Sequence, residues 1–287
     1  MKFTKMHGLG NDFIVLAGFD LLPAEASEQA IRWCDRHFGV GADGLVYLLP
    51  SSRADYMMRI INSDGSEAEQ CGNAIRCAAA YLYENGLVEP FARELTIETI
   101  GAGVQPVRLQ VENGKVRSVR VDMGEPILSG LAVPTTLDED LVIELPIAAG
   151  DREFRFTAVS MGNPHCVIFV DDAPSVELST WGPVLETHPY FPRRANVEFA
   201  SLRSRDYADM RVWERGAGPT LACGTGACAT LVAGVLTGRM ERKGVVSLAG
   251  GELLIEWEEA DNRVYMTGPA ETVFSGTWTL EACGKQI

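Results

Sequence analysis

Two cysteines in similar surroundings are the residues of this chain best suited to chemistry. Cys71 lies in "EQCGNAIRCAAAYL" and Cys223 in "LACGTGACAT", and a glycine and then an alanine-rich apolar run follow each of them. Such runs are typical of helices, so each cysteine is expected at a helix N-terminus. The free N–H groups and the dipole at that end favour a negative charge. We therefore expect lowered pKa values and thiolate character at both cysteines.

Two such thiols on opposite sides of one carbon atom fit one class of reaction. Inversion of a carbon centre by proton transfer requires a base on one face and an acid on the other, and a thiolate and a thiol can exchange these roles. Gly72 and Gly224 would let a ligand approach the backbone closely. The two helix N-termini could then hold a substrate carboxylate while negative charge builds up on it.

Other cysteine chemistry has less support in the sequence. A cysteine before an apolar helix is most often a small buried hydrophobic residue, and this interpretation holds for Cys34, Cys77, Cys228 and Cys283. No histidine pair flanks the cysteines as in many zinc sites, and the C-x-x-C spacing of thioredoxin-like proteins is absent. No lysine stands in a convincing pyridoxal phosphate motif. We predict no metal and no cofactor.

The two cysteines belong to a pattern that recurs along the chain. Three pairs of identical residues share an offset of 152: Cys71 and Cys223, Arg59 and Arg211, and Gly10-Asn11 and Gly162-Asn163. A constant offset predicts a duplicated unit, although so few identities could also agree by chance. Duplicated halves would pack around a pseudo-twofold axis and place the two cysteines in equivalent, facing positions.

Polar residues near these positions could bind a substrate. Four asparagines stand at predicted turns or strand ends, where asparagine is also common for local reasons: Asn11, Asn62, Asn163 and Asn196. With the offset of 152, Asn62 corresponds to Glu214 and Ser63 to Arg215. The halves thus differ where the two ends of an asymmetric substrate would be distinguished. Glu214 and Arg215 could recognise an ammonium and a carboxylate, or could form a surface ion pair.

Strands predominate among the elements that must position these residues. Alternating apolar and polar residues predict strands at 57–63, 94–100, 107–123, 165–172, 208–216, 251–259 and 263–268. Asn113-Gly114 divides the third of these segments into a hairpin. Helices are predicted at 24–37, 72–85 and 224–239. The fold class is α/β of the α+β type, with an N-terminal half (residues 1–120, completed by a C-terminal strand at 272–287) and a C-terminal half (121–271).

Composition and charge argue against several classes of partner. The 287 residues carry a formal net charge of −14 without a basic cluster, which disfavours a nucleic acid or an anionic membrane as partner. No window approaches the ~20 apolar residues of a membrane span, and polar residues interrupt the N-terminal segment. Seven cysteines, an odd number, suit reduced thiols better than a disulfide framework. We expect a cytoplasmic protein.

Six segments together resemble the diaminopimelate epimerase family: "MHGLGNDFIVL", "GVGADGL", "NSDGSEAEQCGNAIRC", "MGNPHCVIFVDD", "ERGAGPTLACGTGACA" and "YMTGPA". The resemblance follows the order of the chain along nearly its whole length. It implies a cofactor-independent isomerase that interconverts LL- and meso-2,6-diaminopimelate in the biosynthesis of lysine and peptidoglycan precursors. It also implies a homodimer of two pseudo-symmetric halves, each a mostly antiparallel sheet wrapped around a central helix, with the active site in the cleft between them.

The resemblance further implies roles for individual residues. Cys71 and Cys223 would be the catalytic acid/base pair, and His165 and Glu214 would set their pKa values or hold the α-ammonium group. The backbone at Gly72-Asn73 and Gly224-Thr225 would hold the reacting carboxylate. The side chains that bind the substrate would be Asn11, Asn62, Asn163, Asn196, Glu214 and Arg215.

The sequence also departs from the family and leaves alternatives open. Gly44 replaces a glutamine that some members use near the substrate, and Ala74 and Pro219 stand where others often have glycine and glutamate. An isomerase of the proline racemase type would need a smaller pocket without a use for a distal carboxylate. Outside the enzymes, a non-catalytic thiol redox or binding protein of the same fold is the alternative, and the intact surroundings of both cysteines count against it.

Overall fold

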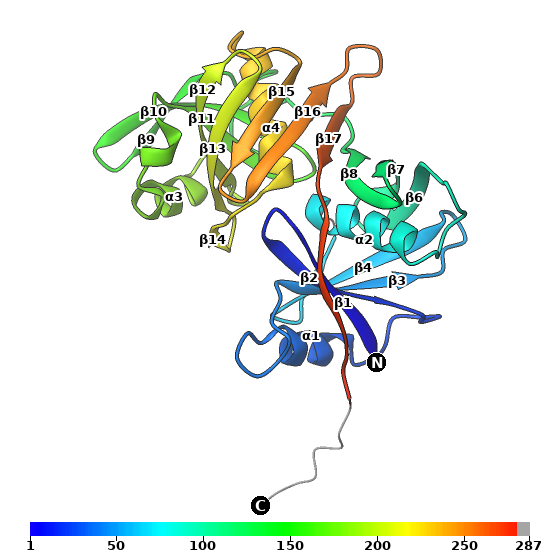
Figure 1. Ribbon diagram of the computed structural model, residues 1–287. Coiled ribbons are helices and arrows are strands. Elements are labelled where there is room, and N and C mark those ends of the chain that lie inside the picture. The colour runs from blue at the N-terminus through cyan, green and yellow to red at the C-terminus, as the bar shows by residue number, and fades with distance from the viewer. Residues whose placement is uncertain (70, 280–287) are drawn as a thin grey trace, which may run out of the picture.

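Residues 1–69 and 71–279 are described in the computed structural model, and they form two bodies that meet along one side (Figure 1). The elements of the N-terminal half are β1 (Lys2–Gly8), β2 (Asn11–Ala17), α1 (Ala26–Cys34), β3 (Gly44–Leu49), β4 (Tyr56–Asn62), β5 (Glu67–Ala68), α2 (Gly72–Glu84), β6 (Glu94–Thr99), β7 (Gly103–Glu112) and β8 (Lys115–Asp122). Its strands run mostly antiparallel, and among the described residues the parallel pairs are β2 with β3 and β4 with β6.

The C-terminal half repeats this plan and adds a short 3₁₀ turn. Its elements are β9 (Leu145–Ala149), β10 (Arg152–Ser160), β11 (Pro164–Phe169), a 3₁₀ turn (Ala173–Ser175), α3 (Leu178–Glu186), β12 (Asn196–Ser204), β13 (Tyr207–Glu214), β14 (Gly218–Pro219), α4 (Gly224–Leu236), β15 (Lys243–Leu248), β16 (Gly251–Trp257) and β17 (Val264–Gly268). The last strand, β18 (Glu271–Thr277), returns to the N-terminal half and pairs with β1.

The register of the strands confirms the duplication. Helices α2 and α4 both span 13 residues, and each begins directly after one of the two cysteines. In the parallel pairs, Phe13 lies opposite Gly44 and His165 lies opposite Asn196, so both positions are related by the offset of 152. The fold class is therefore confirmed as α+β with two pseudo-symmetric halves.

Two strand pairings join the halves. Strand β17 pairs antiparallel with β8, and β18 crosses to pair with β1, as the red strand in Figure 1 shows. Residues 280–287 lie outside the described residues, and with them the end of the predicted strand 272–287 and Cys283. The residue boundaries of the two halves stay a prediction.

Helices α2 and α4 are buried on almost every side because the strands of each half surround them. Helix α2 packs against β8, β1 and β2, and α4 packs against β16, β10 and β15. The alanines in both helices leave room for strands at close distance. In α2 a charged residue, Arg76, is also fully buried. Strands such as β7 alternate buried and exposed side chains, as expected for a sheet with one face on a helix.

The predicted helices and the hairpin are present. The three predicted helices correspond to α1, α2 and α4, and the turn at Asn113-Gly114 joins β7 to β8 with positive φ at both residues, as a tight hairpin turn requires. The sequence analysis missed α3, which contains Gly182 and Pro183. Gly182 fits because a Cβ there would lie only 2.4 Å from the ring of Trp213. Tertiary packing thus decides this helix against its weak propensity.

Candidate active site

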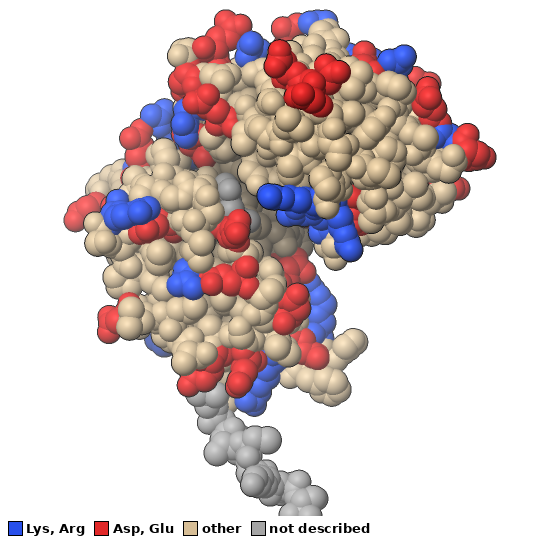
Figure 2. Space-filling model, turned by 180° about the vertical axis from the view of Figure 1, so that it is seen from behind, with Lys and Arg blue, Asp and Glu red and all other residues tan. Residues whose placement is uncertain are grey.

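A cleft of about 1220 Å³ lies between the two halves and contains both predicted thiols. Both halves contribute to its wall: Asn11, Asn62, Cys71, Gly72 and Asn73 from the first, and Asn163, Glu214, Arg215, Cys223, Gly224 and Thr225 from the second. Seen from behind, the molecule narrows between the halves, and basic side chains on the upper half overhang the lower half (Figure 2). The site residues predicted from sequence are thus gathered in one place, except His165 and Asn196, which lie behind the wall.

Cys71 is the N-cap residue of α2 and is half-buried on the N-terminal side of the cleft. Its Sγ lies 3.6 Å from Oδ1 of Asn11, which also accepts a hydrogen bond of 3.0 Å from the side-chain amide of Asn73. The amide of Asn11 in turn donates to Asp43 over 2.7 Å. Asn11 therefore connects the thiol to a carboxylate that the sequence analysis did not predict as part of the site.

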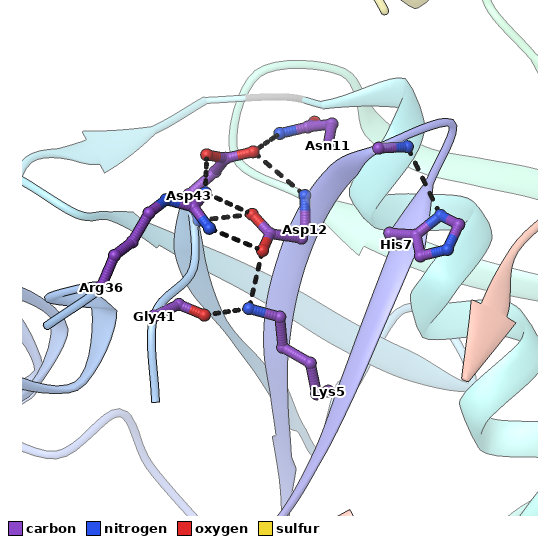
Figure 3. Close-up of polar contacts among 8 residues, drawn as sticks. Lys5, His7, Asn11, Asp12, Arg36, Gly41 and Asp43 are labelled. Atoms are coloured by element: carbon purple, nitrogen blue, oxygen red, sulfur yellow. Dashed lines mark hydrogen bonds and ion pairs between the residues drawn. The ribbon is translucent and has the colours of Figure 1, made fainter. Parts of the chain in front are cut away.

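An ion-pair network holds Asp43 and Asn11 in place (Figure 3). Arg36 lies 2.8 Å from both Asp12 and Asp43, and Lys5 pairs with Asp12 at 2.7 Å and donates to the carbonyl of Gly41. Burial raises the pKa of Asp12, but Arg36 and Lys5 outweigh it and lower the pKa to about 2. Asp12 therefore stays charged at neutral pH, and its contacts with Arg36 and Lys5 fix the turn that presents Asn11.

Cys223 occupies the equivalent position on the other side of the cleft, as the N-cap residue of α4. Its Sγ accepts a hydrogen bond from the backbone N–H of Gly226 at 3.4 Å and lies 3.5 Å from the hydroxyl of Thr225. The residue is 5% exposed, so Cys223 is more enclosed than Cys71. The two thiols share their backbone position but not their surroundings.

Lowered pKa values at these cysteines were expected from the helix N-termini, and this expectation is wrong. Burial raises the pKa of Cys71. The N–H groups of Ala74 and Asn73 and the charge of Arg76 all act to lower it, but burial outweighs them. Burial also holds the pKa of Cys223 well above its ordinary value, and the carboxylates of Glu214 and Glu198 add to this effect. The loss of hydration outweighs the helix N-terminus at both sites.

A buried chain of polar residues lies directly behind Cys223. His165 and Glu198 are both fully buried, and Nδ1 of His165 lies 2.7 Å from Oε1 of Glu198. On its other side, Nε2 of His165 lies 2.9 Å from Oδ1 of Asn163, whose amide donates to the hydroxyl of Thr225 over 3.3 Å. His165 therefore orients Asn163 from behind the wall of the cleft.

Glu214 and Arg215 follow each other at the end of β13. The hydroxyl of Thr220 donates to the Glu214 carboxylate, and burial raises the pKa of that carboxyl group although Thr220 opposes the shift. The backbone N–H of Arg215 donates to Oδ1 of Asn196 over 2.9 Å, while the Asn196 amide donates to the carbonyl of Pro164. Both polar groups of the Asn196 side chain are thus hydrogen-bonded to the backbone, and they fix the strand end that carries Arg215.

The two glycines after the cysteines pack against one side chain, Met266 of β17. A Cβ on Gly72 would lie 2.8 Å from the methyl group of Met266, and a Cβ on Gly224 would lie 2.9 Å from its sulfur. Both contacts are too short for a real side chain. The glycines therefore let the two helix N-termini pack around Met266 without displacing its side chain, in addition to any close approach of a ligand.

Sequence reasoning missed three polar residues of this region: Asp43, Glu198 and Thr220. Asp43 lies in "GVGADGL" and Glu198 in "RANVEFA". A single charged residue within an otherwise buried strand could have drawn attention to Glu198, since a buried carboxylate needs a partner. Nothing comparable marks Thr220, whose role depends on how β14 folds back toward β13.

Cys34, Cys77 and Cys228 fit the interpretation as packing residues, and Cys166, for which the sequence analysis made no such prediction, is also buried. Cys34, Cys77, Cys166 and Cys228 are buried and free, and burial raises the pKa of Cys77 and Cys228 to about 12. Within residues 1–69 and 71–279, no three histidine, cysteine or carboxylate side chains are grouped as a metal site would require. Over the same residues, none of the helices has the length and apolar character needed to cross a membrane.

The sequence matches one protein family along most of its length. The family model described as "Diaminopimelate epimerase" matches residues 3–129 and 157–273. The chain is 57% identical to the diaminopimelate epimerase of Pelotomaculum thermopropionicum, over 97% of this chain and 99% of the relative. It is 55% identical to that of Desulfitobacterium hafniense, over 98% and 99% of the two chains.

Solved structures of more distant proteins share the fold. A hydroxyproline epimerase from Agrobacterium vitis superposes with a TM-score of 0.72 at 19% identity, over 99% of this chain and 92% of the other. A phenazine biosynthesis protein of the PhzF family from Bacillus anthracis gives a TM-score of 0.69 at 18% identity, over 96% and 98%. At these identities the likeness concerns the fold alone.

Proposed function

The chain belongs to the diaminopimelate epimerase family, and on this premise we propose that it interconverts LL- and meso-2,6-diaminopimelate by proton transfer at one α-carbon. The observation that carries the proposal is the pair of thiols, Cys71 and Cys223, at the N-termini of two equivalent helices that line one cleft. A base and an acid at related positions on two walls are what inversion of a carbon centre needs.

In this mechanism the two thiols exchange one proton each with the substrate. The thiolate of one cysteine takes the α-hydrogen, and the C–H electron pair moves into the adjacent carboxylate. The thiol of the other cysteine then delivers its proton to the opposite face of the carbon. One thiolate and one thiol remain, with their roles exchanged. The N–H groups at Gly72-Asn73 and Gly224-Thr225 would stabilise the negative charge that develops on the carboxylate.

Recognition of the substrate would use neutral and charged side chains of the cleft. Asn11, Asn62 and Asn163 line the cleft with neutral amide groups, whereas Glu214 and Arg215 bring an acid and a base. An arginine can bind a carboxylate through two parallel hydrogen bonds, so Arg215 suits the distal carboxylate of the substrate. Glu214 suits an ammonium group. Asn196 supports Arg215 through its backbone, and His165 supports Asn163.

The same proposal extends to the setting in which the protein works. No group in the mechanism needs a metal or an organic cofactor, and both thiols must stay reduced, which suits the cytoplasm. We further propose a homodimer. Cell fractionation and light scattering on the purified protein check these two points separately from the activity.

Chiral chromatography of LL-diaminopimelate incubated with the purified protein tests the main proposal. We expect meso-diaminopimelate to appear without an added cofactor, and incubation with EDTA to leave the rate unchanged. Because burial raises the pKa of both thiols, the rate should increase as the pH rises from neutral and more thiolate forms. The proposal would be overturned in favour of another isomerase if neither isomer of diaminopimelate is converted at any pH, whereas proline or hydroxyproline is.

A further inference from the structure

The surroundings of the two thiols break the pseudo-symmetry of the fold. Behind Cys223 lie His165 and Glu198, which are both fully buried. With the offset of 152, their counterparts behind Cys71 are Phe13 and Val46, both apolar and buried. A buried carboxylate therefore accompanies only one of the two thiols.

Glu198 approaches Cys223 through a gap that a glycine provides. A Cβ on Gly226 would lie 2.6 Å from Oε1 of Glu198 and 3.2 Å from Sγ of Cys223. The counterpart of Gly226 in the first half is Ala74, which has a side chain. Oε2 of Glu198 is buried and finds no hydrogen-bond partner among the described residues. His165 thus contacts one oxygen of this carboxylate, and the other oxygen is buried without a partner in the part of the chain described.

A buried charge of the opposite sign accompanies Cys71. Arg76 lies one turn further along α2 and is fully buried. In the described structure its guanidinium donates to the carbonyls of Pro269 and Gly72, to the side chain of Asn73 and to the sulfur of Met266, none of which is a carboxylate. Its counterpart in α4 is the neutral Cys228.

Among the charged groups that act most strongly on the thiols, Glu198 and Arg76 each act on one thiol only. Glu214 of β13 acts on both thiols and disfavours the thiolate at both. Glu198 of β12 acts in the same direction at Cys223, and Arg76 of α2 acts in the opposite direction at Cys71. Thr225 and Gly226 lower the pKa of Cys223, and the N–H groups of Ala74 and Asn73 lower that of Cys71, whose thiol also donates to Oδ1 of Asn11.

We propose that Glu198 and Arg76 give the two thiols a fixed order of ionisation, so that Cys71 loses its proton before Cys223. Neither residue lines the cleft, and both act on the thiols and not on a substrate. For catalysis the inference rests on the proposed function. The protein would then start each cycle with the thiolate on Cys71, ready for the isomer whose α-hydrogen points to the wall formed by α2.

Alkylation of each thiol as a function of pH tests this order without any substrate. The protein is treated with limiting iodoacetamide between pH 6 and 10, and the modified cysteines are identified by peptide mass spectrometry. We expect Cys71 to react at lower pH than Cys223. Glu198→Gln keeps the shape but removes the charge, and should increase the rate at Cys223 about tenfold, as one pKa unit predicts, with little change at Cys71.

Glu186→Gln is the matched control, because Glu186 is a buried carboxylate of the same half that contacts Trp213 and Gly216. It should leave the alkylation order and rates unchanged. Arg76→Gln should slow alkylation of Cys71, and Arg76→Lys should restore part of the rate. If the arginine variants do not fold, as judged by circular dichroism, Glu198→Gln alone decides.

Two results would overturn the inference: wild-type protein in which Cys223 reacts first or at the same pH, and a Glu198→Gln variant with unchanged reactivity at Cys223. Either can occur in a protein that fully epimerises diaminopimelate. Conversely, a failure to epimerise leaves the alkylation order measurable. The inference and the proposed function can therefore fail separately.

Discussion

The two halves of this protein share a backbone but differ in the side chains that the backbone presents. In the first half Glu67 of β5 lies opposite Ile61 and forms an ion pair with Arg59. The second half keeps the arginine as Arg211 but has Pro219 at the register position of the acid, opposite Trp213. The two halves therefore have the same strand register here, but the second half lacks the ion pair. The difference teaches that duplication fixes where residues lie, whereas function depends on what has been substituted there.

The same contrast is found on the walls of the cleft. On the N-terminal side, the side-chain amide of Asn62 is bonded to the hydroxyl of Ser66 at 3.0 Å. At the equivalent place on the C-terminal side stand Glu214 and Arg215, with their charges facing the cleft. This difference at equivalent positions would allow two similar halves to bind a substrate in one orientation.

The largest effect is expected from removal of either thiol. Cys71→Ala and Cys223→Ala should each lower the rate of epimerisation by about 10²–10⁴-fold or more, because one face of the carbon is left without its proton carrier. Chiral chromatography measures the loss. Cys77→Ala is the control from the same helix: it should reduce stability but keep the rate. A near wild-type rate in either variant would show that the halves do not act as a facing pair.

A smaller loss is expected from removal of the Arg215 side chain. Arg215→Ala removes an exposed side chain and should lower kcat/KM for diaminopimelate about 10–100-fold, as the loss of charge-assisted hydrogen bonds predicts. Its melting temperature should stay close to that of the wild type. Arg194→Ala, an exposed neighbour paired with Glu186, is the control and should keep the kinetics. A clear drop in melting temperature with unchanged kinetics would make Arg215 a structural residue.

The sequence predicted the parts of this molecule that follow from local pattern. Alternation gave the strands, the Asn113-Gly114 turn gave the hairpin, and the offset of 152 related the two cysteines. These features depend on neighbours along the chain. The raised pKa values of the thiols depend on burial by distant strands, which no local pattern encodes, and the sequence around Glu198 marks it only as a charged residue in an apolar strand. For the same reason α3 was missed, since its Gly182 is required by Trp213 of β13.

A pair of matched substitutions compares the helix N-termini directly. Gly226→Ala places a Cβ 2.6 Å from Glu198, and should cost about 1–3 kcal/mol in the free energy of unfolding because a buried carboxylate must shift. Ala74→Gly, the reverse change at the equivalent position, should cost only about 0.5–1 kcal/mol from helix propensity. Urea denaturation gives both values. Equal costs would mean that Glu198 adjusts freely and does not distinguish the two halves.

The smallest effect concerns the ion pair that the second half has lost. Pro219→Glu would give Arg211 the partner that Glu67 gives Arg59, since positions 67 and 219 have the same register. The Arg59–Glu67 pair is partly exposed, so such a pair should contribute at most about 1 kcal/mol to the free energy of unfolding.

Double-mutant cycles measure the two coupling energies, one with Arg59→Ala and Glu67→Ala, the other with Arg211→Ala in the Pro219→Glu background. We expect similar values, both reduced by added salt. If residues 59 and 67 are coupled but residues 211 and 219 are not, the two halves are equivalent in their backbones and not in their side-chain interactions.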